Sequence, residues 1–204
     1  MMNEEDLKMI PEVPEKEPVS GSIVLGRFQP FHRGHIALIE WAYEQKESTF
    51  LRIVIGSANR PQTPDNPWSW EERKEMINSW KENVHPEWNL EIIAIPDINN
   101  PPKWVKHAEK YHGKSGLILT SDKETQELYE KEKWKSKFFE LEERDTLEGW
   151  RVRETCKMLS TVKEKEAVKI ILSETIHESV IEWLMEKDHL RRLPFLGPNV
   201  ENVG

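Results

Sequence analysis

An apolar segment near the start of the chain, residues 22–25, stops abruptly at Gly26. A short apolar run that ends in glycine is typical of a strand buried on both faces of a parallel sheet. Apolar residues then recur at helical spacing from Ile36 to Tyr43, which predicts a helix directly after His35. A strand, a loop and a helix in this order begin a strand–helix–strand unit, so an α/β protein is expected.

The same alternation continues along the chain. Further strand patterns lie at residues 50–55, 90–95, 115–120 and, more weakly, 137–141. Helical patterns lie between them, around residues 104–111 and 125–133. Ser69 and Glu72 form a capping box, which predicts the start of another helix. Strands separated by helices in this way predict a doubly wound parallel sheet.

The two ends of the chain differ from this core. Residues 1–19 are rich in Glu, Lys and Pro and bury too little apolar surface to offset the entropy of ordering, so a flexible tail is expected. From about Gly149 the pattern is helical, and one apolar face consists of Ile176, Val180, Ile181, Leu184 and Met185. A chain of 204 residues has room for one good α/β core, so residues 20–204 are predicted to form a single domain with a helical C-terminal part.

Composition excludes several classes of function. The net charge of −8 argues against a general nucleic-acid-binding protein, because a phosphate backbone requires a basic surface. No apolar run approaches the roughly 20 residues that span a bilayer, and the N-terminus lacks the pattern of a signal peptide. Cys156 is the only cysteine, which excludes an intrachain disulfide and a cysteine-based zinc cluster. A cytoplasmic protein with neither a nucleic-acid nor a membrane partner is expected.

The loop from Gly26 to His35 lies where a doubly wound fold binds phosphates, between the first strand and the first helix. Backbone amides at a helix N-terminus and the helix dipole favour an anion there. Gly26 and Gly34 let the backbone approach a phosphate closely. His32 and His35 can present both imidazoles to one polyphosphate, and Arg27 adds a permanent positive charge. The loop is therefore predicted to bind a polyphosphate.

Two simpler explanations of His32 and His35 compete with this one. Two histidines are too few for a zinc site, and no cysteine lies near them in the sequence. Structural histidines are the usual explanation of an isolated pair, but the strand before and the helix after favour a phosphate site. The spaced glycines of the dinucleotide fingerprint and the Walker A pattern are both absent.

The segment from Gly26 to His35 resembles the GRFQPFHxGH signature of archaeal-type nicotinamide mononucleotide adenylyltransferases, within the HxGH nucleotidyltransferase superfamily. Later segments that resemble the same family lie at residues 56–58, 66–73 and 96–99, with Trp104 shortly after. Together the matches span residues 22–110, and weaker similarity continues to Arg153.

The resemblance implies a Rossmann-like fold and the transfer of adenylate from ATP to nicotinamide mononucleotide, giving NAD and pyrophosphate. A phosphate oxygen of the mononucleotide would attack the α-phosphorus of ATP in line, with no covalent enzyme intermediate. That oxygen is already ionised at neutral pH, so catalysis would consist of positioning and charge stabilisation without a general base. Mg²⁺ would accompany ATP, held by phosphates and water, so no protein metal site is implied.

The resemblance also implies roles for individual residues. The catalytic set is His32, His35, Arg27 and Arg153. The ATP-binding set adds Gly26, Phe28, Gln29, Gly34, Gly56, Ser57 and Arg151. The set for nicotinamide mononucleotide is Asp97, Asn99, Trp104 and Arg73, with Trp104 stacked on the cationic ring. The alternative is packing for Trp104 and a strand-ending turn for Asp97 and Asn99. The alternative for Arg27 is a solvated charge on the surface, and the alternative for Arg73 is an ion pair with a glutamate of its own helix.

Two segments depart from the family pattern. The superfamily's second signature, I-S-x-T-x-x-R, aligns with residues 147–153, where Glu148 replaces the serine and Trp150 the threonine. A carboxylate there would repel phosphate, and Arg151 offers a compensating donor fork. Residues 120–122 read Thr-Ser-Asp in place of Thr-Gly-Asn.

Two hypotheses therefore stay open beside the first. One is a nucleotidyltransferase that uses another phosphomonoester as acceptor. The other is a catalytically weak nucleotide-binding or regulatory protein. The preference between nicotinamide and nicotinate mononucleotide and the assembly, including a homo-oligomer, are also left open by the sequence.

Overall fold

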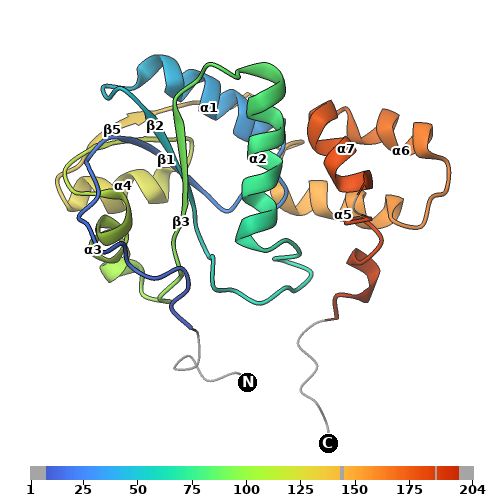
Figure 1. The fold of residues 1–204 in the computed structure, drawn as a ribbon, viewed down its shortest axis with the longest axis horizontal. Helices are drawn as coiled ribbons and strands as arrows, with labels where there is room; N and C mark the ends of the chain where they lie inside the picture. The colour runs from blue at the N-terminus through green and yellow to red at the C-terminus, as the bar shows by residue number, and fades with distance from the viewer. Residues whose placement is uncertain (1–7, 143–144, 187, 198–204) are drawn as a thin grey trace, which may run out of the picture.

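The computed structural model describes residues 8–142, 145–186 and 188–197. Its centre is a parallel sheet of five strands in the order β3-β2-β1-β4-β5 (Figure 1). The strands are β1 (Ser22–Gly26), β2 (Leu51–Ile55), β3 (Leu90–Ala94), β4 (Leu117–Thr120) and β5 (Lys135–Phe138). The helices are α1 (Arg33–Gln45), α2 (Trp70–Val84), α3 (Pro101–His112), α4 (Lys123–Lys131), α5 (Gly149–Leu159), α6 (Lys165–Leu172) and α7 (Glu178–Glu186), with a 3-10 helix η2 (Leu193–Phe195).

The chain winds outward from β1 in both directions. β1 pairs with β2 on one side and with β4 on the other, and every pairing is parallel. The order of strands therefore reverses between β1 and β4, and the loops after these two strands diverge at the carboxyl edge of the sheet. The predicted doubly wound α/β fold is confirmed, and the space between the diverging loops is where such folds bind ligands.

Helices cover both faces of the sheet. One core joins the sheet to α1, α2 and the C-terminal helices, and a second core joins its other face to α3 and α4. Figure 1 shows α5, α6 and α7 gathered beyond α2, away from α3 and α4. The predicted apolar face is confirmed: Val180, Ile181 and Leu184 of α7 are buried, as is Ile176 just before that helix, and Met185 is partly buried.

Hydrogen bonds tie the C-terminal helices to the first two helices of the chain. The Ser79 hydroxyl on α2 donates to the backbone oxygen of Ser179 at 3.1 Å. Arg33, the first residue of α1, donates from its backbone N–H to the oxygen of Thr175 at 2.8 Å and from Nε to the oxygen of Ser173 at 3.0 Å. The N-terminus of α1 is therefore held in place by the turn between α6 and α7.

The fifth strand lies earlier than the sequence pattern indicated. β5 occupies residues 135–138, whereas the prediction was 137–141. Lys135 and Lys137 alternate with Ser136 and a half-buried Phe138 on this edge strand, so it lacks the continuous apolar run of a strand buried on both faces. The apolar residues that follow lie outside the sheet, in the loop that leads to α5.

The N-terminal segment lies along α3 and the amino edge of the sheet. The Tyr111 hydroxyl donates to the backbone oxygen of Pro11 at 3.2 Å, and the Arg52 guanidinium donates to that of Val19 at 2.8 Å. The flexible tail at residues 1–19 and the single domain at 20–204 stay predictions. No helix among the described residues is both long enough and apolar enough to cross a bilayer.

Candidate functional site

A cavity of about 280 Å³ opens at the carboxyl edge of the sheet, between the N-termini of α1 and α5. Its walls are His32, Gly34, His35, Leu38, Ser121, Leu141, Leu147, Glu148, Gly149 and Trp150. A helix N-terminus carries unpaired backbone amides and the positive end of a dipole, and two of them border this one space. The structure thus brings the first signature and the aligned second signature together at a site suited to an anion.

His32 and His35 are held by hydrogen bonds to the backbone of their own helix. His32 is the N-cap of α1, and its Nδ1 accepts from the Gly34 N–H at 3.2 Å. Nδ1 of His35 accepts from the His32 N–H at 3.3 Å. A neutral imidazole that accepts at Nδ1 carries its proton on Nε2. Each ring therefore has an Nε2–H donor, and within the described part of the chain neither donor has a hydrogen-bond partner.

Burial keeps both imidazoles neutral. Burial and the charge of Arg153 lower the pKa of His32 to about 4. Burial also lowers the pKa of His35 well below its ordinary value, and the neighbouring His32 lowers it further. The two ring centroids are only 3.7 Å apart, so two charged rings would repel each other. At neutral pH the pair offers two N–H donors to an anionic oxygen, an arrangement for charge stabilisation.

Tight packing of this loop explains its glycines. A Cβ on Gly34 would lie 3.1 Å from Cε1 of His32, and a Cβ on Gly26 would lie 2.9 Å from the Phe28 ring. Phe28 is buried and packs edge-on against His35, with ring centroids 4.8 Å apart. Gly26, Gly34 and Phe28 thus shape the histidine loop, and their contact with ATP stays a prediction.

Arg27 and Arg153 bring positive charge to the histidine loop. Arg27 is exposed. Arg153 on α5 is nearly buried, donates to the backbone oxygen of Gln29 at 2.8 Å and lies 3.9 Å from the Asp65 carboxylate. Burial lowers the pKa of Arg153, and the charge of Arg27 lowers it further. Action of Arg27 and Arg153 on a bound anion stays a prediction.

Arg73, whose contact with nicotinamide mononucleotide stays a prediction, lies inside the protein. It is fully buried, and its guanidinium donates to the backbone oxygens of Arg27 at 2.7 Å, Gly56 at 2.9 Å and Ser57 at 3.3 Å. Burial, together with the charge of Arg27, lowers the pKa of Arg73 to about 10. These bonds join the loop after β1 to the loop after β2, so Arg73 positions the site from inside the protein.

Gln29 has a similar internal position. Its side-chain N–H groups donate to Asn66 at 2.5 Å and to the backbone oxygen of Trp68 at 2.7 Å, and its Oε1 accepts from the Trp68 N–H at 3.2 Å. These bonds hold the loop before α2 against the histidine loop. Contact of Gln29 with ATP stays a prediction.

The loop after β3 brings Asp97 and Asn99 to a residue that sequence reasoning missed, Arg60. The Asp97 carboxylate accepts from the Arg60 guanidinium at 2.9 Å and from the Ser57 hydroxyl at 3.4 Å. The Asn99 side chain also accepts from Arg60, and the backbone N–H of Asn99 donates to the Asp97 carboxylate at 3.0 Å. The only sequence signal for Arg60 was its place in the glycine-serine loop after β2.

Trp104 lies on the first turn of α3, directly after this loop. It is partly buried against the core on that face of the sheet, and its ring centroid is 5.9 Å from that of His107. His107 in turn is hydrogen-bonded through Nε2 to the backbone oxygen of Pro96 at 2.9 Å. Asp97, Asn99 and Trp104 therefore share one corner of the carboxyl edge, and stacking of Trp104 on a ligand stays a prediction.

The segment that departs from the family pattern forms a local cluster. Oε2 of Glu148 accepts from the Trp150 indole N–H at 2.6 Å and lies 3.5 Å from Nε of Arg151. The Arg151 guanidinium also lies over the Trp150 ring, 4.7 Å from its centroid. Arg151 therefore balances the Glu148 carboxylate directly, which reduces the repulsion that this carboxylate exerts on a phosphate.

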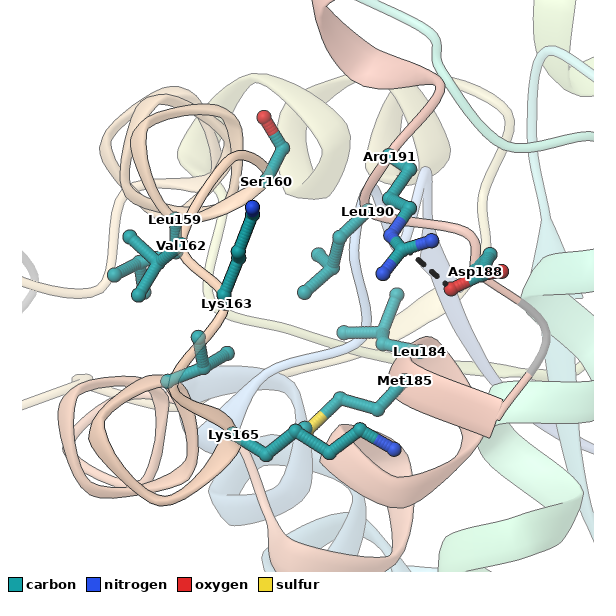
Figure 2. Close-up of a pocket in the computed structure, with 11 residues that line it drawn as sticks. Leu159, Ser160, Val162, Lys163, Lys165, Leu184, Met185, Asp188, Leu190 and Arg191 are labelled. Carbon is teal, nitrogen blue, oxygen red and sulfur yellow. Dashed lines mark ion pairs between the residues drawn. The ribbon is translucent and has the colours of Figure 1, made fainter.

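A second cavity, of about 60 Å³, lies among the C-terminal helices (Figure 2). Lys163, Lys165 and Arg191 line it together with apolar side chains, and Arg191 is paired with Asp188 at 3.4 Å. It contains none of the residues predicted for the site, whereas the cavity between α1 and α5 is lined by His32 and His35. We therefore assign the functional site to the carboxyl edge of the sheet.

The fold defines a class of protein: a nucleotide-binding α/β protein with a doubly wound parallel sheet. A family model described as cytidylyltransferase-like matches residues 23–189. The chain belongs to the cytidylyltransferase-like family. The resemblance stated from the sequence is confirmed.

Individual relatives agree with this placement. A Thermoplasma acidophilum protein named nicotinamide-nucleotide adenylyltransferase is 30% identical over 159 residues, which cover 77% of this chain and 85% of that protein. A Thermoplasma volcanium protein of the same name is 28% identical over 182 residues, 89% of this chain and 95% of that protein.

A solved structure shows the same fold. It is a bifunctional NMN adenylyltransferase/ADP ribose pyrophosphatase from Francisella tularensis complexed with AMP and a manganese ion. The TM-score is 0.54 at 20% identity, and the match covers 89% of this chain and 57% of that chain. Our chain thus spans a little more than half the length of this structural relative.

Proposed function

We propose that the chain transfers adenylate from ATP to nicotinamide mononucleotide, giving NAD and pyrophosphate. The observation that carries the proposal is the pair of unpartnered Nε2–H donors of His32 and His35 at the cavity between α1 and α5. Curated relatives named nicotinamide-nucleotide adenylyltransferase, aligned over most of this chain, support the choice of acceptor.

In this proposal the enzyme binds ATP in the cavity between the N-termini of α1 and α5, with its phosphates at the two histidines of α1. A phosphate oxygen of the mononucleotide attacks the α-phosphorus in line, the bond to the bridging oxygen breaks, and pyrophosphate leaves with the electron pair. His32 and His35 donate hydrogen bonds to the phosphate oxygens, and Arg27 and Arg153 offset the negative charge that develops. The neutral histidines need not accept a proton, because the attacking oxygen is already ionised.

The acceptor binds at the corner formed by the loops after β2 and β3. Trp104 stacks on the pyridinium ring, because a cationic ring favours an aromatic face. Asp97 and Asn99 hydrogen-bond the carboxamide, and Arg60 fixes their orientation through its bonds to both side chains. Arg73 acts as a positioning residue, since its donors are bonded to the backbone of the two loops.

A divalent cation accompanies ATP, and in this proposal it is Mg²⁺. Within the described residues, no group of three or more His, Cys, Asp or Glu side chains is arranged to hold a metal ion. In this proposal the cation is held largely by phosphate and water, as Mg²⁺ with ATP commonly is. The cation would supply charge neutralisation for the leaving pyrophosphate.

The direct test is pyrophosphate release from ATP and nicotinamide mononucleotide, combined with titration calorimetry of the mononucleotide. Trp104→Ala is expected to weaken mononucleotide binding about tenfold without changing ATP binding, because stacking contributes roughly 1–3 kcal/mol. Trp104→Phe, which keeps an aromatic face, is the matched control and should retain most of the affinity. Binding of ATP but not of the mononucleotide would contradict the proposed acceptor.

The departures at Glu148 and Trp150 favour one second candidate, a catalytically weak nucleotide-binding or regulatory homologue. It predicts ATP binding with little or no pyrophosphate release. A turnover rate that depends on His35 excludes this candidate. We also propose that the protein is cytoplasmic and forms a homo-oligomer. Light scattering of the purified chain tests the homo-oligomer.

A further inference from the structure

The start of α5 holds an acceptor oxygen in a fixed place. Oε2 of Glu148 is anchored by the Trp150 indole N–H at 2.6 Å and by Arg151 at 3.5 Å. Oε1 of the same carboxylate has no hydrogen-bond partner within the described part of the chain. Glu148 forms no side-chain cap for its own helix either. The carboxylate is therefore oriented by its neighbours, while one oxygen stays available to a ligand.

The cavity that Glu148 lines has two kinds of wall. His32 and His35 contribute N–H donors, which suit phosphate oxygens. Leu38, Leu141, Leu147 and Trp150 contribute apolar surface, which suits a flat base. A nucleotide whose phosphates meet the histidines therefore has apolar walls left for its base, next to the Glu148 carboxylate.

We propose that Glu148 and Trp150 determine which base the site accepts: Oε1 of Glu148 accepts a hydrogen bond from the 6-amino group of adenine, and Trp150 packs against the base. This inference rests on the proposed function, since it concerns the nucleoside triphosphate of that reaction. A carboxylate is an acceptor without a donor, so it favours an edge that presents an amino group over one that presents none or an oxygen.

This role accounts for the charge of Glu148 beside a phosphate site. Arg151 lies on the Trp150 ring and beside Oε2, so it offsets the carboxylate while leaving Oε1 open. The hydroxyls expected at positions 148 and 150 would bind phosphate. In this inference Glu148 and Trp150, which replace them, form a pair that recognises the base (the base-reading pair), and the histidines and arginines bind the phosphates.

The test uses the full chain and removes the hydrogen bond between Glu148 and the 6-amino group in two ways, once from the nucleotide and once from the protein. Titration calorimetry with Mg²⁺ compares ATP with purine riboside triphosphate, which lacks only the 6-amino group. Wild type should bind ATP about tenfold more tightly, because a hydrogen bond to a charged acceptor is lost with the amino group. Glu148→Ala should reduce this ratio to about one, by weakening ATP and not the analogue.

The matched control is Glu154→Ala, which removes an exposed carboxylate from the same helix outside the cavity. Loss of negative charge strengthens both triphosphates equally, so the ratio should stay near ten. Trp150→Phe keeps an aromatic ring but removes the N–H that anchors Oε2, and it should lower the ratio by a smaller factor. This variant preserves the test if Glu148→Ala does not fold.

The outcomes separate the inference from the proposed function. A tenfold ratio in wild type that disappears in Glu148→Ala and persists in Glu154→Ala supports the base-reading pair. A ratio near one in wild type, or an unchanged ratio in Glu148→Ala, overturns the inference and leaves the adenylyltransferase proposal standing. Failure of wild type to bind either triphosphate overturns both.

Discussion

Histidines lie at both edges of the sheet: His112 and His32 are buried, His35 is partly exposed, and the two edges differ in hydrogen bonding. At the amino edge, His112 is fully buried, with Nε2 bonded to the Tyr129 hydroxyl at 2.9 Å and Nδ1 to the backbone oxygen of Gly113 at 2.8 Å. At the carboxyl edge, His32 and His35 use only Nδ1 within the described structure. Burial lowers the pKa of His112 and of His32 alike, to about 4.

Hydrogen bonding at Nε2 is what distinguishes a structural histidine from a histidine that can bind a ligand. Burial and a lowered pKa are common to both edges, so neither property marks function by itself. A buried polar atom normally has a hydrogen-bond partner. His32 and His35 line a cavity where a ligand can meet their Nε2 donors, whereas the closed set of bonds around His112 points to the stability of the fold.

The largest expected effect comes from His35→Ala. We expect kcat for pyrophosphate release to fall by roughly 100- to 1,000-fold, the usual cost of removing one preorganised donor to a transition-state anion. His112→Ala, assayed at a temperature where it is folded, should change kcat less than about twofold. Equal losses in the two variants would remove the distinction between the edges.

His112→Ala should instead affect stability. The substitution leaves the buried Tyr129 hydroxyl without its partner and opens a cavity, so the free energy of unfolding should fall by about 2–4 kcal/mol. Urea unfolding followed by circular dichroism measures the change. Tyr129→Phe is the companion variant, and a loss below about 0.5 kcal/mol in both would show that this bond contributes little.

Acid should destabilise both edges in the same pH window. Since the folded-state pKa values of His32 and His112 lie near 4 and the ordinary value is 6.5, the unfolded chain takes up protons first as the pH falls. The free energy of unfolding should therefore decrease between pH 6.5 and 4, by up to about 2 kcal/mol per histidine from pH 7 to 5.

Unfolding curves at several pH values test this dependence. His112→Asn removes one titrating group and should flatten the slope, without moving the pH dependence of kcat. A slope that is identical in wild type and this variant would place the titrating groups elsewhere.

The smallest expected effect is that of Arg153→Ala. Because Arg153 lies at the histidine loop and keeps the cation of the second signature, its loss should raise the KM for ATP about tenfold, or roughly 1.4 kcal/mol. Arg151→Ala is a useful comparison, because Arg151 is paired with Glu148. An unchanged KM in Arg153→Ala would mean that the second signature was aligned incorrectly.

Much of the fold followed from periodicity and turn chemistry. The apolar runs predicted β1 to β4, and Ser69 with Glu72 forms the capping box expected at the start of α2. β5 was misplaced because an edge strand with Lys135 and Lys137 lacks an apolar run. β3 lies at the other edge of the sheet and was predicted correctly because it does carry an apolar run, so the pattern fails where lysines take the place of apolar residues.

The site was predictable where one segment carries the chemistry, as in His32 and His35. It was less predictable where distant segments meet. Arg73 matched a family motif, yet its donors are bonded to loop carbonyls that no local pattern reveals. Arg60 was missed because its partners, Asp97 and Asn99, lie on a different loop. Hydrogen-bond partners across loops are set by the tertiary fold, and spacing in sequence does not encode them.

The bonds from Arg33 to the turn between α6 and α7 bear on how the chain can be shortened. Arg33 lies between His32 and His35 in the sequence, and it donates hydrogen bonds to the backbone oxygens of Ser173 and Thr175. A truncation before residue 173 would keep every strand and every signature residue, yet it would free the first turn of α1. The C-terminal helices thus hold the Nε2–H donors of His32 and His35 in position. Removing these helices is expected to weaken phosphate binding before it unfolds the sheet.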